Sequence, residues 1–295
     1  ATLAVQLAAR GRSGAILTRG FGSPLAGPLV VAPGNALAGD EARLLADRLE
    51  PYHWPVVQAR RRERGLKLLR ERFPKLDVVI AEDSHQTACL ARHLDVLILD
   101  QWRFESQDGR RVVEPVTGAV FPFGPYRESA RGAGRAEIWL LETEGSCPAS
   151  CHKTAQVSTF SRRVQLVPTR PGDPLPDRTL PWAALSGIAR PEGLEMAVGR
   201  VLGHGALLAI RCGDHAHYGV DQVRRIERAV RAAGAGYVVT TAKDWVKLES
   251  VWTGSIPVVL AELTIIWGKE QALPDLIGER LEASQAGGYS SLPNP

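Results

Sequence analysis

The chain has 295 residues, of which 44% are hydrophobic and 23% are charged, a balance typical of globular proteins and a length that allows two domains. The net charge of +4 favours an anionic partner, but it does not distinguish a nucleotide from a phospholipid surface or nucleic acid. Four cysteines cannot form the dense disulfide framework of small secreted domains, so we expect a reducing compartment. No apolar run reaches the roughly 20 residues that span a bilayer, and the first residues do not form a signal peptide.

The first half of the chain predicts helices that alternate with short buried strands. A helix at residues 2–9 precedes a strand at 15–18, and a Pro- and Gly-rich loop at 24–39 leads to a helix at 41–49 that Asp40 caps. The further elements expected in this half are a basic amphipathic helix at 60–72, strands at 78–81, 95–100 and 138–141, and a polar loop or hairpin at 107–113. The basic helix is either a solvated helix packed on a sheet or a surface that meets anionic lipid.

The second half repeats this alternation after loose regions at 146–154 and 168–181. The elements expected there are a connecting strand at 164–167, a loop from 185, helices at 192–202, 221–233 (capped by Asp221) and 273–286, and strands at 206–210, 237–240 and 257–260. Strands that alternate with helices predict an α/β fold with a parallel sheet. We place a domain boundary near residue 156, which divides the chain into domains of residues 1–155 and 156–295.

One stretch, residues 77–86, combines a buried strand with acidic residues. Val78 to Ala81 are apolar, and Glu82 and Asp83 follow directly. A strand that ends in adjacent acids brings negative charge to the carboxyl edge of a parallel sheet, where open α/β sheets bind ligands. Acids at that edge can hold Mg²⁺ against nucleotide phosphates in phosphoryl-transfer enzymes. The alternative is a strand followed by a solvated acidic turn.

Two further motifs of the first half place charged residues beside tight turns. Asp40 follows Gly39 at a predicted helix start, where it is either a helix cap or a general base near phosphates. Arg127 and Glu128 follow a Pro- and Gly-rich turn and offer a phosphate clamp and a metal ligand. The alternative for this pair is a role in surface ion pairs.

The second half offers weaker candidates. Asp214 beside His215 suggests an imidazole oriented for proton transfer, or else a metal site. Lys243 lies at the end of a predicted strand, where it suits phosphate or sugar contacts. Cys147 and Cys151 suggest zinc, but no second pair of ligands has matching spacing. A G-x-S-x-G elbow for serine hydrolysis is absent from the sequence.

The order of these motifs resembles that of the tetraacyldisaccharide 4'-kinases of Gram-negative lipid A synthesis, and the resemblance covers nearly the whole chain. The family's S-R-G-Y-G, G-D-E-P and D-D-G-x-Q-H motifs are similar to T-R-G-F-G at 18–22, G-D-E-A at 39–42 and E-D-S-H-Q-T at 82–87. Its L-P-A-G-P-L-R-E, A-G-I-x-x-P, D-H-H/x-x-Y/F and T-T-E-K-D-x-V-K/R-L motifs resemble residues 121–128, 186–191, 214–218 and 240–248. Seven motifs in one order make chance agreement improbable.

The resemblance implies a P-loop NTPase-like parallel sheet with helices on both faces, plus a second, smaller α/β domain that closes the active-site cleft. It implies an ATP-dependent kinase that transfers the γ-phosphate to the 4'-hydroxyl of a tetraacylated glucosamine disaccharide 1-phosphate. The implied cofactors are ATP and Mg²⁺. The implied partners are the acylated disaccharide lipid and the inner-membrane surface, with no nucleic acid. The implied location is the cytoplasmic face of the bacterial inner membrane, with peripheral attachment.

The resemblance also implies a role for each matched residue. Asp40 would take the proton of the 4'-hydroxyl, with support from His215. The residues implied to serve Mg²⁺ are Glu82, Asp83 and Glu128. Those implied to bind phosphate or substrate are Arg19, Gln86, Arg127 and Lys243. Such roles fit phosphoryl transfer, in which positioning and charge neutralisation outweigh covalent chemistry.

The chain departs from the family pattern in several places. The family's G-G-T-G-K-T-P phosphate loop and the membrane-associating helix before it are not in these 295 residues, and we expect them to precede Ala1. Residues 1–295 alone are then expected to turn over ATP poorly, which kinase activity of that segment would refute. Within the motifs, Glu82, Ser84, Thr87 and Ala242 replace Asp, Gly, His and Glu, and the first change is conservative for a metal ligand. A catalytically inactive relative that only binds lipid-sugar or nucleotide is therefore an alternative, and an unrelated α/β binding protein is a third.

Overall fold

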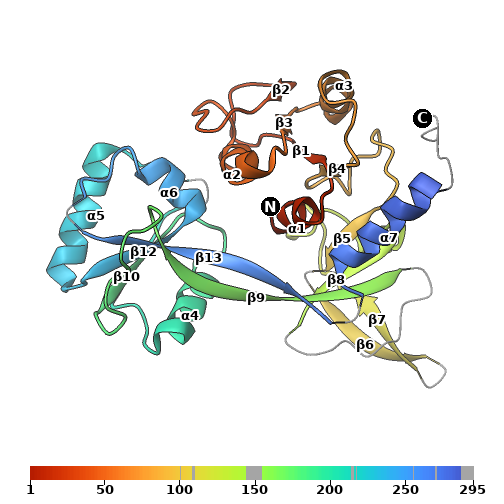
Figure 1. Ribbon diagram of the computed structural model, residues 1–295. Coiled ribbons are helices and arrows are strands. Elements are labelled where there is room, and N and C mark those ends of the chain that lie inside the picture. The colour runs from red at the N-terminus through yellow and green to blue at the C-terminus, as the bar shows by residue number, and fades with distance from the viewer. Residues whose placement is uncertain are drawn as a thin grey trace.

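Two β-sheets and the helices around them make up the protein, as Figure 1 shows. The structure is a computed structural model that describes residues 1–99, 101–107, 110–143, 155–213, 216, 218–254, 256–269 and 271–286. The chain forms an α/β fold, as the alternation of strands and helices predicts. A separate two-stranded hairpin consists of β6 (Trp102–Gln107) and β7 (Arg110–Pro115), which confirms the hairpin expected near 107–113.

Sheet A has four strands in the order β2-β3-β1-β4. They are β1 (Gly14–Thr18), β2 (Leu29–Val30), β3 (Val56–Gln58) and β4 (Val78–Ala81). Strand β1 pairs in parallel with both β3 and β4, whereas β2 is antiparallel to β3. The central position of β1 explains why all five of its residues are buried. The helical segments of this part are α1 (Thr2–Ala9), α2 (Asp40–Leu49), α3 (Arg62–Arg72) and the short 3-10 turn η1 (Glu50–Tyr52).

Sheet B has seven strands in the order β11-β10-β12-β13-β9-β8-β5. They are β5 (Val96–Leu99), β8 (Ile138–Glu142), β9 (Gln156–Pro168), β10 (Trp182–Ser186), β11 (Leu208–Arg211), β12 (Tyr237–Thr241) and β13 (Val258–Trp267). Neighbouring strands are parallel except for β9 and β13, which pair antiparallel along most of their length. These two long strands connect the left and right parts of the molecule in Figure 1.

Helices cover both faces of sheet B (Figure 1). They are α4 (Pro191–Leu202), α5 (Val220–Ala233), α6 (Ala242–Leu248) and α7 (Leu273–Ala286), and a 3-10 segment η2 (Ala130–Arg135) precedes β8. Successive side chains of β10 point to opposite faces of sheet B, so they pack in two different hydrophobic cores. Trp182 and Ala184 pack with residues of α4, while Ala183 and Leu185 pack with residues of α5 and α6.

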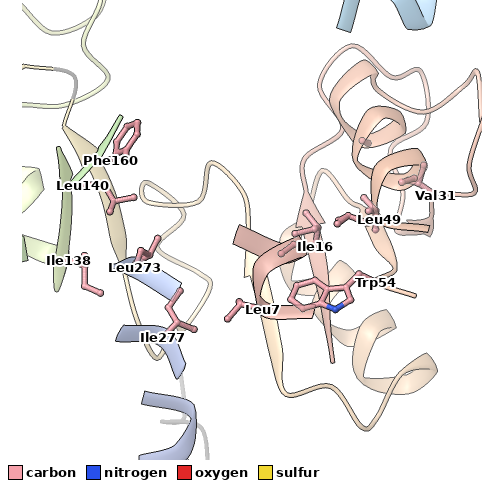
Figure 2. Packing of buried hydrophobic residues seen from close by; sticks show 14 of the residues in the cluster. Leu7, Ile16, Val31, Leu49, Trp54, Ile138, Leu140, Phe160, Leu273 and Ile277 are labelled. Carbon is pink, nitrogen blue, oxygen red and sulfur yellow. The ribbon is translucent and has the colours of Figure 1, made fainter. Parts of the chain in front are cut away.

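One hydrophobic core contains residues of both sheets, and α1 contributes side chains to its middle. In Figure 2, Leu7 lies between the Leu273 and Ile277 side chains of α7 and the group that contains Ile16 and Trp54. Leu7 is fully buried. Because this core includes residues of both sheets, α1 fixes sheet A against the β8 and β9 part of sheet B.

Several expectations about elements need correction. The strand expected at 164–167 is part of β9, which has 13 residues, and the loop expected from 185 begins with the last two residues of β10. The helix α6 was not expected at all. Gly39 and Gly219, rather than Asp40 and Asp221, are the N-cap residues of α2 and α5. The domain boundary near residue 156 stays a prediction.

Candidate functional site

The carboxyl ends of β1 and β4 lie side by side because these strands are parallel neighbours. Thr18 ends β1, and its Oγ1 donates a hydrogen bond of 2.8 Å to Oε2 of Glu82, the first residue after β4. Burial raises the pKa of Glu82 above its ordinary value, and the nearby carboxylates of Glu41 and Asp83 add to this effect. The carboxyl edge of sheet A is therefore a partly buried place where negative charges crowd.

Asp83 lies in a tight turn between two arginines. Its φ of 47° places it in the left-handed region, whereas Ser84 has no such conformation, so the Ser in place of the family's Gly is not strained in this way. Nη1 of Arg127 donates to both carboxylate oxygens of Asp83, at 2.6 and 2.8 Å. Arg62 is only 4% exposed and donates to the backbone oxygen of Asp83 at 2.9 Å. These arginines balance part of the acidic charge.

The turn after Asp83 connects to Glu128. Nε2 of Gln86 donates to Oε1 of Glu128 at 2.8 Å, and Nη2 of Arg135 donates to both of its carboxylate oxygens. Burial acts to raise the pKa of Glu128, but the hydrogen bonds from Arg135 and Gln86 prevail and hold it below its ordinary value. His85 lies next to Glu128, with Nε2 3.5 Å from Oε1 of Glu128 and Nδ1 2.9 Å from Oδ2 of Asp95.

Asp40 is the first residue of α2, whose start is fixed by β3. Gln58 ends β3 and is fully buried, and its Oε1 accepts a hydrogen bond of 2.9 Å from the backbone nitrogen of Gly39. Nε2 of Gln58 donates to Ser23 Oγ and to the backbone oxygen of Leu25, so one side chain ties the turn after β1 to the start of α2. The amino end of α2 thus lies at the same edge of sheet A as Glu82.

A lysine from α6, the helix that follows β12 of sheet B, forms an ion pair with Asp40. Nζ of Lys247 in α6 lies 2.5 Å from Oδ2 of Asp40 and donates to the backbone oxygen of Ala216 at 3.2 Å. Arg43 of α2 donates to the backbone oxygen of Val246 in α6. The amino-terminal half of α2 is therefore bound to α6, and Asp40 lies at the boundary between the two sheets.

Asp244 organises the strand ends of sheet B beneath α6. It is fully buried and accepts hydrogen bonds from the backbone nitrogen of Gly187, the hydroxyl of Tyr218 and Oγ1 of Thr241, at 3.0, 2.9 and 2.7 Å. Burial, with the Asp244 carboxylate, raises the pKa of the Tyr218 phenol, which stays protonated as a donor. These bonds join the segments that follow β10 and β11 to the last residue of β12, directly before Lys243 in α6.

The expected site residues are thus distributed over two connected groups. One group is a network of hydrogen bonds and adjacent residues that contains Glu82, Asp83, Gln86, Arg127 and Glu128. Asp40 lies at the start of α2, next to Glu41, whose carboxylate affects the pKa of Glu82. Arg19 follows β1 directly and is exposed, and Lys243 lies in the first turn of α6. His215, Cys147 and Cys151 lie outside the described residues.

Sequence reasoning missed three residues of this site: Lys247, Arg62 and His85. Lys247 follows Lys243 by four positions on one helix, so the spacing alone places both on one face. The sequence predicts Arg62 as part of a solvated basic helix, yet it lies against the acidic turn.

Within the described residues, no group of three or more His, Cys, Asp and Glu side chains is arranged to hold a metal ion. None of the helices described has the length and apolar character that crossing a bilayer requires.

Comparison with known proteins identifies the family. The model of the tetraacyldisaccharide-1-phosphate 4'-kinase family matches residues 1–282. The chain belongs to this family. Among its relatives, the tetraacyldisaccharide 4'-kinase of Geobacter sulfurreducens is 34% identical over 88% of this chain and 72% of its own length. That of an Anaeromyxobacter species is 30% identical over 99% of this chain and 79% of its own length.

A solved structure has the same fold. The crystal structure of LpxK from Aquifex aeolicus in complex with ATP superposes with a TM-score of 0.64 and 23% sequence identity, over 95% of this chain and 82% of that one. The chain therefore shares the α/β fold of that structure, with two mainly parallel sheets and helices around them. This agrees with the fold class that the motif order predicts.

Proposed function

We propose that the protein is an ATP-dependent kinase that phosphorylates the 4'-hydroxyl of a tetraacylated glucosamine disaccharide 1-phosphate. The observation that carries this proposal is that the start of α2, with Asp40, lies at the same edge of sheet A as Glu82 and Asp83, which follow β4. Membership of the family, whose relatives bear the name of this activity, supports the same reaction.

In the proposed reaction, the 4'-oxygen of the sugar forms a bond to the γ-phosphorus of ATP. The bond from that phosphorus to the β,γ-bridging oxygen breaks, and ADP leaves. Asp40 accepts the hydroxyl proton, and His215 supports it. Lys247 holds the Asp40 carboxylate in one orientation, because its ammonium group forms an ion pair with Oδ2.

Three basic side chains and one amide are available to bind phosphates and sugar. Arg127 and Gln86 belong to the acidic network, Arg19 extends from the end of β1, and Lys243 lies near the Asp244 node. We assign these four residues to the phosphates and the sugar. Arg127 would then exchange Asp83 for a phosphate oxygen when substrate binds, since a guanidinium pairs with either group in the same geometry.

The donor set at this edge suits Mg²⁺, which takes one or two carboxylates and completes its shell with water and phosphate. The raised pKa of Glu82, where carboxylates crowd, fits a place that a cation would stabilise. Glu82 and Asp83 would hold the ion. We also assign Glu128 to this ion, although the three carboxylates do not form one metal-binding group among the described residues. The ion would supply charge neutralisation on the phosphates.

The acylated substrate implies a membrane partner. We propose that the protein works at the cytoplasmic face of the bacterial inner membrane, as a peripheral protein, because the acyl chains of the substrate keep it in a bilayer.

A radiolabelled transfer assay tests the proposed function. The gene product is incubated with γ-labelled ATP, Mg²⁺ and tetraacyldisaccharide 1-phosphate in detergent micelles, and the labelled lipid is separated by chromatography. Asp40→Asn should lower kcat by about 10²- to 10⁴-fold, the range of a general base. Asp47→Asn is the matched control, since Asp47 lies on the same helix and binds only the backbone nitrogen of Gly34 among the contacts described. Equal activity of wild type and Asp40→Asn would refute the assignment of the base.

A further inference from the structure

A loop next to the candidate site presents two phenylalanines to solvent. Residues 116–129, which we call the phenylalanine loop, connect β7 to η2. Within it, Phe121 is 78% exposed and Phe123 is 90% exposed, the two highest values among the large hydrophobic side chains described. Neighbouring exposed apolar side chains are candidates for an interaction site, because large contiguous apolar patches on soluble proteins often mark one.

The loop has a defined conformation. The backbone nitrogen of Phe121 donates to the oxygen of Tyr126 at 2.7 Å, and that of Phe123 donates to the oxygen of Val120 at 2.9 Å. A Cβ atom on Gly124 would lie 2.1 Å from the backbone oxygen of Ala119, so the chain closes tightly on itself. The two aromatic side chains are therefore exposed from an ordered turn, which lowers the entropic cost of inserting them into a partner.

The loop is attached to the acidic edge of the candidate site. Arg127 ends the turn and donates to Asp83, and Glu128 accepts from Gln86. Phe123 is thus only four residues from a side chain that contacts the proposed phosphate-binding edge. A partner that binds the phenylalanines would lie beside the place where the sugar of the substrate is phosphorylated.

One arginine beside the loop, Arg131, is available to an anionic partner. Residues 116–136 contain three arginines and one glutamate, with no lysine or aspartate. Arg127 and Arg135 form ion pairs with Asp83 and Glu128, whereas Arg131 is exposed and forms no ion pair with a described residue. Aromatic side chains next to arginine are typical of segments that insert at the headgroup level of anionic membranes.

We infer that the phenylalanine loop inserts Phe121 and Phe123 into the anionic bilayer that carries the acylated substrate, and so holds the active-site edge at the membrane surface. This inference rests on the proposed function for the identity of the lipid substrate. The basic helix α3 cannot insert in the same way, because its apolar residues Leu66 and Leu69 pack against sheet A. Its exposed Arg64 and Lys67 could attract the bilayer only by charge.

A vesicle flotation assay tests this inference. Partitioning of the gene product is measured on vesicles of phosphatidylethanolamine and phosphatidylglycerol, and on neutral phosphatidylcholine vesicles. The loop variant is Phe121→Ser with Phe123→Ser, and the matched control is Met196→Ser with Leu207→Ser, two exposed apolar residues away from the site. Loss of each phenylalanine should weaken partitioning about tenfold. The control should stay within about twofold of wild type.

Further arms separate the sources of binding. Arg64→Ser with Lys67→Ser should weaken partitioning only on the anionic vesicles and only at low salt, since those charges are fully solvated. Loop-variant partitioning within about twofold of wild type would overturn the inference. So would an equal loss in the control, or a wild-type protein that does not bind vesicles. Kinase activity in detergent micelles is measured in parallel: its absence in the wild type refutes the proposed function without affecting the flotation result.

Discussion

Replacing Lys247 with methionine should lower the kcat of the proposed kinase while the KM for ATP stays nearly unchanged. Nζ of Lys247 lies 2.5 Å from Oδ2 of Asp40 and also donates to the backbone oxygen of Ala216. Methionine has a similar length but carries no charge and no donor. Asp40 would therefore lose the group that holds its carboxylate in place, although the residues assigned to ATP would be untouched.

The magnitude follows from the burial of the pair. The side chain of Lys247 is 9% exposed and that of Asp40 is 26% exposed. The pair therefore lies between exposed ion pairs, which contribute up to about 1 kcal/mol, and buried pairs, whose disruption costs about 3–5 kcal/mol. We expect a loss of about 2 kcal/mol, which corresponds to a decrease in kcat of about 30-fold if the transition state bears all of it and about 5-fold if it bears half.

The assay is the initial rate of phosphoryl transfer as a function of ATP and lipid concentration. Lys247→Arg should restore most of kcat, because a guanidinium can donate to the same two oxygens. Arg43→Met is the matched control: it removes the bond from α2 to Val246 of α6 but leaves the charge pair in place. A kcat of Lys247→Met within about twofold of wild type would refute the reasoning, as would a loss that Arg43→Met reproduces in full.

Two other substitutions test how the site is held in place. Gly20→Ala should lower the free energy of unfolding in urea by about 2–4 kcal/mol, because Gly20 has a φ of 69° and a Cβ atom would lie 2.0 Å from Cγ of Gln58. Gly22→Ala, with a φ of 78° and no atom within 4 Å of the added carbon, should cost only about 1 kcal/mol; equal losses would contradict the packing argument. Asp244→Ala should cost about 1–3 kcal/mol in the same experiment, because the buried Tyr218 hydroxyl loses its acceptor, and no measurable cost would count against the role of this carboxylate.

Local patterns predicted many elements of the fold. The helices Thr2–Ala9 and Leu273–Ala286 have the bounds that their apolar periodicity predicts. By contrast, β9 extends over 13 residues because it pairs with β13 nearly 100 residues further along the chain, and no local signal carries that pairing. The short helix α6 was missed since its seven residues are too few to show a period.

Some residues of the candidate site can be predicted from short motifs, whereas others come together only in the folded chain. The acidic turn at Glu82 and Asp83 and the start of α2 at Asp40 come from short motifs, and the structure brings them to one edge. The Asp40–Lys247 pair joins helices α2 and α6, which lie about 200 residues apart in the sequence, so only the folded chain reveals it. Arg62 is charged, which predicts exposure, yet it is buried and donates to the backbone oxygens of Leu17 and Asp83.

The central claim is that this protein phosphorylates the 4'-hydroxyl of an acylated disaccharide. The most direct measurement is the structure of the product formed from ATP and tetraacyldisaccharide 1-phosphate, determined by mass spectrometry and phosphorus NMR. The account predicts a second phosphate on the 4'-oxygen, with one ADP released for each lipid converted. A folded gene product that leaves the lipid unmodified, or that transfers the phosphate to another hydroxyl, would contradict it.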